Sequence, residues 1–107
     1  MSPANEESEG GVTLQESKPE IKEPPRFAVC LHNDDYTTME FVMEILKRYF
    51  HKTEEQASQI MLSVHQQGKG VAGIYHYEIA ETKVVQVHEC ARSRGFPLKC
   101  TTELVKD

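Results

Sequence analysis

From Phe27 onward, hydrophobic and polar positions follow two periods, one typical of strands and the other of helices. Large side chains at Phe27, Val29 and Leu31 alternate with smaller or polar ones, which is the two-residue period of a β-strand over 27–32. The aromatic and β-branched residues of 71–77 predict a second strand, and 98–102 a short third one.

Three segments carry apolar residues at helical spacing. Two of them open at capping boxes, Thr37-x-x-Glu40 and Thr53-x-x-Gln56. The first helix should end near residues 50–51, and the second should stop at Gly68. A third helix is predicted over 81–94, with Gly95 as its stop. The inward positions are Phe41, Val42, Ile45, Leu46 and Tyr49; then Ala57, Ile60, Met61 and Val64; then Val84, Val87, His88 and Ala91.

The predicted element order is β-α-α-β-α-β, which places the chain in the α+β class. Helices that segregate to one side of a small sheet give a two-layer sandwich. We therefore expect a three-stranded, mainly antiparallel sheet with three helices on one face, and we find no internal repeat.

The first 25 residues differ in composition from the rest. They contain three glutamates within 6–9, three prolines in 19–25 and only Val12, Leu14 and Ile21 as large aliphatics. Such a segment buries too little apolar area to offset its ordering entropy. We predict a disordered extension over 1–25 and a folded domain over 26–107. The extension fits a passive tail and a flexible handle for a partner equally well.

Charge and hydropathy exclude two classes of protein. The net charge of −5 and a pI near 5.5 are unlike the basic patches of nucleic-acid binders. No apolar run approaches the ~20 residues of a membrane helix. The polar, acidic first ten residues do not resemble a signal peptide. We expect a cytoplasmic protein that contacts neither nucleic acid nor membrane.

The cysteines give no sign of a disulfide framework or a zinc site. Cys30, Cys90 and Cys100 are odd in number, and no two have C-x-x-C spacing. We interpret all three as reduced residues that fill space, because free cysteine is often buried. No metal or other cofactor is predicted.

The candidate chemistry lies at Asn33-Asp34-Asp35, between the first strand and the first helix. An amide and two carboxylates place several acceptors at one point, although the same residues are common in ordinary turns. Met61 and His65 are four residues apart and share a helix face. If the first two helices pack side by side, Met39, Val42 and Met61 line an apolar recess with His65 at its rim.

These residues resemble those of the ClpS family, bacterial adaptors of the Clp ATP-dependent protease. The resemblance covers about 26–104 and is carried by three motifs in the same order and at similar spacing. They are Leu31-x-Asn33-Asp34-Asp35-Tyr36-Thr37-x-Met39-Glu40-Phe41-Val42, Met61-Leu62-x-Val64-His65-x-x-Gly68-Lys69 and Ala80-Glu81-Thr82-Lys83. Thr38 stands where many members have proline, at an expected first helical position, with little expected effect on function.

The resemblance implies a fold, a function and a set of sites. The fold is similar to that of the C-terminal domain of the ribosomal stalk protein. The function is to bind N-degrons, proteins that begin with Leu, Phe, Tyr or Trp, and to deliver them to the ClpA unfoldase, which feeds the ClpP peptidase. By correspondence, the α-amino group is bound by Asn33, Asp34 and His65. The side-chain pocket corresponds to Asp35, Thr37, Met39, Val42, Met61, Val64 and Leu98.

The resemblance also implies how the adaptor meets its partners. The unfoldase-docking surface corresponds to Glu78 and Lys83 with the neighbouring helix, and the partner is the N-terminal domain of ClpA or of an equivalent unfoldase. The disordered extension is needed for delivery in the family, which favours a functional tail here. The expected protein is a monomer and not an enzyme.

Three other interpretations fit the residues less well. A hydrolase could use Cys30, His32 and Asp34, but alternate residues of a strand do not aim a base at a nucleophile. A metal site of His32, Asp34 and His65 lacks compact ligand spacing. A ribosomal interaction module would share the expected fold but has no need for the acidic loop with a histidine.

Overall fold

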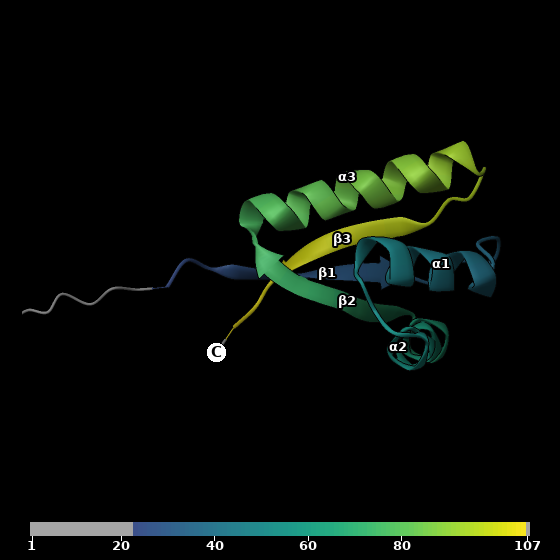
Figure 1. The fold of residues 1–107 in the computed structure, drawn as a ribbon, viewed down its shortest axis with the longest axis horizontal. Helices are drawn as coiled ribbons and strands as arrows, with labels where there is room; N and C mark the ends of the chain where they lie inside the picture. The colour runs from purple at the N-terminus through teal and green to yellow at the C-terminus, as the bar shows by residue number, and fades with distance from the viewer. Residues whose placement is uncertain (1–22, 107) are drawn as a thin grey trace, which may run out of the picture.

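The computed structural model describes residues 23–106, which form a three-stranded sheet covered on one face by three helices (Figure 1). The strands are β1 (Arg26–His32), β2 (Lys69–His76) and β3 (Lys99–Leu104), in the order β2-β1-β3 with both pairings antiparallel. The helices are α1 (Met39–Tyr49), α2 (Glu54–Gln67) and α3 (Tyr77–Ser93). The predicted α+β class and element order are confirmed. The extension predicted over 1–25 lies largely outside the described residues.

The core lies between the sheet and the helices and is centred on β1. Val29 and Leu31 are fully buried there, packed with Phe41, Ile45 and Leu46 of α1 and with further residues of α2 and α3. Ala28 and Cys30, on the opposite face of β1, are buried as well. β1 lies between β2 and β3, so both of its edges are hydrogen-bonded within the sheet.

The start of α1 differs from the prediction. The N-cap is Thr38, whose hydroxyl oxygen accepts a hydrogen bond from the Phe41 amide at 3.1 Å. The predicted Thr37-x-x-Glu40 capping box is therefore wrong, and Thr38 is not the first helical residue. Thr37 and Thr38 are adjacent and either could cap the helix, but the Thr37 hydroxyl donates to the Asp34 carboxylate instead. The capping box of Thr53 and Gln56 and the left-handed Gly68 at the end of α2, with φ of 85°, are confirmed.

The helix α3 begins four residues earlier than predicted, at Tyr77 instead of Glu81. No turn residue separates β2 from α3, and the chain passes from one to the other at His76. Tyr77 and Ile79 favour strands in isolation, but Ala80 is fully buried in the core, and that packing overrides the local preference. β2 and β3 are each shifted by one or two residues from the predicted ranges.

A close approach between β2 and α2 sets the position of α2 against the sheet. A Cβ atom at Gly70 would lie 2.8 Å from Cγ2 of Val64 and 3.1 Å from the carbonyl oxygen of Ile60. Only glycine leaves room for this contact, so α2 lies directly against the strand. The position of Val64, and of the helix face around it, is thereby set by the sheet.

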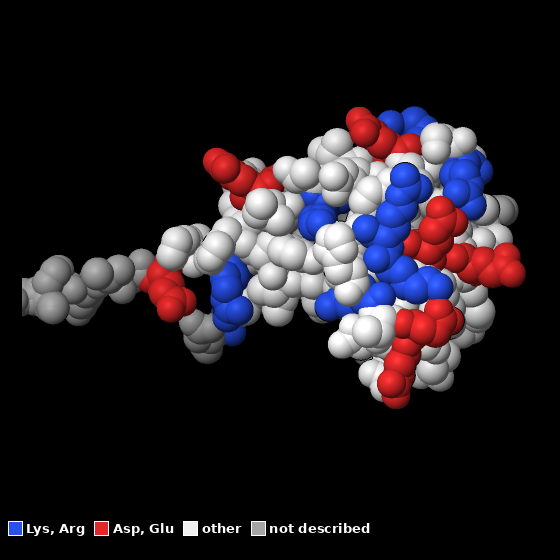
Figure 2. Space-filling view, in the orientation of Figure 1, with Lys and Arg blue, Asp and Glu red and all other residues white. Residues whose placement is uncertain are grey.

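The described surface is charged but mixed in sign. On the face in Figure 2, lysine and arginine side chains are interleaved with aspartate and glutamate. Lys47 and Glu54 form one ion pair at 2.7 Å, and Arg94 and Glu44 another at 3.2 Å. Such exposed pairs contribute little stability individually. Within residues 23–106 there is no helix long and apolar enough to cross a membrane.

Candidate functional site

A hollow of about 280 Å³ opens between the loop after β1 and the helices α1 and α2. Its lining contains nine of the ten residues that the sequence assigned to amino-group and side-chain binding. They are Asn33, Asp34, Asp35, Thr37, Met39, Val42, Met61, Val64 and His65. The tenth, Leu98, is not part of the lining; it is buried in the core, with 4% of its surface exposed.

Two connections fix the rim of this hollow. The loop is the direct continuation of β1, and the Asn33 amide donates to the Gly68 carbonyl at 2.9 Å. Gly68 caps the end of α2, one turn beyond His65. The acidic loop and the histidine therefore lie on opposite segments that are joined by a backbone hydrogen bond.

Asp34 is held by three hydrogen bonds from its own loop. One carboxylate oxygen accepts from the amides of Tyr36 at 2.8 Å and Thr37 at 2.7 Å, and the other accepts from the Thr37 hydroxyl at 2.7 Å. Partial burial raises the pKa of Asp34, but the hydrogen bonds from Thr37 and Tyr36 outweigh it, so this pKa lies below its ordinary value. Asp34 is thus a fixed negative charge at neutral pH.

The floor of the hollow is apolar and belongs partly to the core. Val42 of α1 and Val64 of α2 are buried, with 6% and 3% of their surfaces exposed. Met61 is half-buried, and Met39, the first residue of α1, is 49% exposed at the mouth. The hollow therefore combines apolar walls with a rim of oxygen and nitrogen acceptors.

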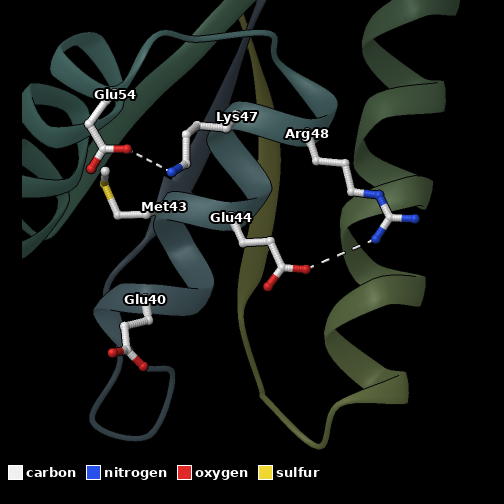
Figure 3. A pocket seen from close by; sticks show the side chains of 6 residues that line it. All are labelled: Glu40, Met43, Glu44, Lys47, Arg48 and Glu54. Atoms are coloured by element: carbon white, nitrogen blue, oxygen red, sulfur yellow. Dashed lines mark hydrogen bonds and ion pairs between the residues drawn. The ribbon is translucent and has the colours of Figure 1, made fainter.

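A larger depression, of about 550 Å³, lies on the outer side of α1 (Figure 3). Its lining is mostly charged side chains that pair with one another, as Lys47 does with Glu54 and Arg48 with Glu44. Met43 is the one apolar residue in this lining, which comprises Glu40, Met43, Glu44, Lys47, Arg48 and Glu54. Paired charges around a single methionine make a solvated surface, so the smaller hollow is the better candidate.

The two predicted docking residues lie away from the hollow, on α3. Glu78 is exposed in the first turn. Lys83 is half-buried, and its ammonium donates to the Tyr49 carbonyl at 2.6 Å, at the end of α1. It also lies over the rings of Phe50 and Tyr75, at 5.9 and 5.6 Å from their centroids. The contact by which Lys83 joins α3 to α1 was not predicted from the sequence.

Two residues of the alternative hydrolase and metal sites, Cys30 and His32, have structural roles. The thiol of Cys30 is buried, which raises its pKa and disfavours a nucleophilic thiolate. The ring of His32 shares a 2.7 Å hydrogen bond with the Thr101 hydroxyl, and burial, reinforced by Lys99 and Lys69, lowers the His32 pKa. Within 23–106, no group of three or more His, Cys, Asp or Glu side chains is placed to hold a metal ion.

One histidine has a structural role that sequence periodicity did not reveal. Nε2 of His88 accepts a hydrogen bond from the Cys100 amide at 3.0 Å and so ties α3 to β3. His88 was predicted only as an inward position of its helix. An apolar pattern identifies the face of a helix but not the backbone amide that a polar residue on that face will meet.

Comparison with known proteins gives consistent matches along the chain. The family model described as ATP-dependent Clp protease adaptor protein ClpS matches residues 22–101. The ClpS adapter protein of Lawsonia intracellularis is 52% identical over 105 residues, covering 98% of this chain and 94% of that relative. The one from Oleidesulfovibrio alaskensis is 59% identical over 86 residues, covering 80% and 83%.

A solved structure agrees with the fold. Agrobacterium tumefaciens ClpS2, determined bound to L-phenylalaninamide, superposes with a TM-score of 0.75 at 37% identity, covering 78% of this chain and all of that one. With a family model matched over 22–101 and relatives this similar over most of its length, the chain belongs to the ClpS family of ATP-dependent Clp protease adaptor proteins.

Proposed function

We propose that the hollow binds the first residue of proteins that begin with Leu, Phe, Tyr or Trp, and that the chain delivers them to a Clp protease through the ClpA unfoldase. In this proposal the chain acts as a cytoplasmic monomer, needs no cofactor and carries out no chemical step. The observation that carries it is the meeting of acceptors from Asn33, Asp34 and His65 at the rim of an apolar hollow.

The acceptors suit a free α-amino group. Such an amine is a cation below a pKa of ~7.7–8.0, and it offers three donors. The side-chain oxygens of Asn33 and Asp34 and a ring nitrogen of neutral His65 supply three acceptors. An internal peptide N–H has one donor and no charge, so it would leave the remaining acceptors unpaired, at a cost of about 1–3 kcal/mol each.

The energies fit weak, reversible capture. Burial of a Leu or Phe side chain contributes roughly 1.5–3 kcal/mol, and each hydrogen bond to a charged group contributes about 1.5–3 kcal/mol. One side chain and two or three such bonds, less the cost of association, give a Kd on the order of micromolar. Neither contribution alone would distinguish a hydrophobic first residue from an unfolded segment or from any other N-terminus.

The ligand of the solved relative supports the same chemistry. Phenylalaninamide carries a free α-amino group and one aromatic side chain, and ClpS2 of Agrobacterium tumefaciens was determined bound to it. Those two groups match the rim and the floor of the hollow. The proposed contact with the unfoldase uses Glu78, Lys83 and the exposed side of α3, and the first 25 residues are proposed to assist delivery.

A peptide series that varies only the first residue tests the proposal. We expect peptides beginning with Leu, Phe, Tyr or Trp to bind at least about tenfold more tightly than those beginning with Ala or Glu, because the floor of the hollow is apolar. Fluorescence anisotropy of C-terminally labelled peptides measures this difference. Equal affinities across the series would contradict the proposed function.

The role of His65 predicts the effect of removing its ring. As an acceptor, a ring nitrogen of His65 receives one of the three donors of the ligand amine. We expect His65→Ala to bind a Leu-initiated peptide at least about tenfold more weakly, because one hydrogen bond to a charged group is lost.

The matched variant is His65→Gln, which keeps a side-chain acceptor at the same position. It should retain more affinity than His65→Ala, and isothermal titration calorimetry measures both variants beside the unmodified protein. Full affinity in His65→Ala would remove His65 from this role.

A further inference from the structure

Thr37 lies in the loop between β1 and α1 and is hydrogen-bonded to Asp34 through its amide and its hydroxyl. Two of the three hydrogen bonds that Asp34 accepts come from this one residue, one from its amide and one from its hydroxyl, each at 2.7 Å. The remaining bond comes from the Tyr36 amide and reaches the same oxygen as the Thr37 amide. The Thr37 hydroxyl is therefore the group that fixes the second carboxylate oxygen.

The start of α1 explains why this hydroxyl is available. Because Thr38 supplies the N-cap, Thr37 lies just outside the helix and its side chain is not used in capping. The Thr37 amide and hydroxyl instead both donate to the Asp34 carboxylate, three residues earlier in the same loop. A carboxylate fixed only at one oxygen can swing about that oxygen, whereas one fixed at both keeps a single direction.

We propose that Thr37 is a positioning residue for ligand binding, which orients the Asp34 carboxylate toward the α-amino group through its hydroxyl. The inference rests on the proposed function, since it assumes that Asp34 receives the amine. It assigns Thr37 a part different from the one implied by resemblance, where its side chain is a wall of the pocket for the first residue.

The charged neighbours do not provide a substitute for this contact. Asp35 follows Asp34 directly and carries the same charge, and His65 faces the hollow from α2. A second carboxylate cannot donate to Asp34, and a neutral His65 is needed as an acceptor for the ligand. Within residues 23–106 the hydrogen bonds to the Asp34 carboxylate come only from Tyr36 and Thr37.

Two substitutions separate the hydroxyl from the methyl group. Thr37→Val keeps the shape and the apolar wall but removes the hydroxyl, whereas Thr37→Ser keeps the hydroxyl and removes the methyl. If Thr37 acts through Asp34, the valine variant should bind a Leu-initiated peptide about three- to tenfold more weakly, because one bond to a charged group is lost in a half-exposed site. The serine variant should retain most of the affinity.

A measurement without ligand reports on the contact itself. The ¹³C resonance of the Asp34 carboxyl can be followed against pH in the free protein. Loss of the hydroxyl bond should raise the midpoint of this titration in Thr37→Val, whereas Thr37→Ser should titrate like the unmodified protein. Thr82→Val is the matched control, because it removes a threonine hydroxyl whose hydrogen bond within residues 23–106 goes to the Glu78 carbonyl on α3, away from the hollow.

The outcomes separate this inference from the proposed function. Weak binding by Thr37→Ser with full binding by Thr37→Val would identify Thr37 as a wall and overturn the positioning role. An unchanged Asp34 titration in Thr37→Val would overturn it as well. If the unmodified protein failed to distinguish first residues while the Asp34 titration still moved in Thr37→Val, the proposed function would fail, but the orienting contact would stand.

Discussion

Acetylation of the first residue of a Leu- or Phe-initiated peptide should weaken its binding by at least about 100-fold. The acetyl group removes the positive charge and two of three donors, so at least two charge-assisted hydrogen bonds are lost at about 1.5–3 kcal/mol each. The negative charge of Asp34, whose pKa is lowered by hydrogen bonds from its loop, then has no ligand cation to pair with. Anisotropy of an acetylated and a free peptide of the same sequence measures the ratio.

The control for acetylation is a change at the other end of the peptide. Amidation of the C-terminus alters charge by one unit as well, but it lies several residues from the hollow and should change the affinity less than about twofold. If acetylated and free peptides bound equally, the rim of Asn33, Asp34 and His65 would not be an amino-group site.

Replacement of Met39 by alanine should admit first residues that are branched at Cβ. Met39 stands at the mouth of the hollow, where we expect its thioether to pack against an unbranched Cβ and to clash with Ile or Val. Overpacking of this kind costs about 1–3 kcal/mol, so removal of the side chain should strengthen binding of Ile-initiated peptides by at least about fivefold. Leu-initiated peptides should change much less.

Leu62→Ala is the matched control for this substitution. Leu62 is an exposed apolar residue of α2, at 45% exposure against 49% for Met39, and it is not part of the lining. Its removal should leave the ratio of Ile to Leu binding unchanged. An anisotropy series in which Met39→Ala still excluded Ile would show that another residue sets the preference.

The order of elements was predictable because hydrophobic period and turn chemistry agreed. The alternation at Phe27, Val29 and Leu31, the capping box of Thr53 and the stop at Gly68 all correspond to observed structure. The start of α3 was not predictable, because Tyr77 and Ile79 favour strands and only burial of Ala80 reveals the helix. The predicted start of α1 was wrong for a different reason: Thr37 and Thr38 are adjacent, and either could serve as the N-cap as judged from the sequence alone.

The residues of the hollow were predictable from motif resemblance, but the bonds among them were not. Sequence placed Asn33, Asp34 and His65 in one site, and the structure lines one hollow with them. The orientation of Asp34 depends on which threonine caps α1, because the other one is free to bond its carboxylate. Residue spacing alone did not decide between Thr37 and Thr38. The contact of Lys83 with the Tyr49 carbonyl depends on how α3 crosses α1, and no local pattern encodes that crossing.

The division of the hollow into core walls and an exposed mouth bears on how its preference can be redesigned. Val42 and Val64 also fill the interior of the protein, so a substitution that reshapes them also disturbs the packing between helices and sheet. Met39 lies at the surface and is not one of the core residues. Variants selected for new first residues should therefore accumulate changes at position 39 before positions 42 and 64, and those that alter the valines should lose thermal stability.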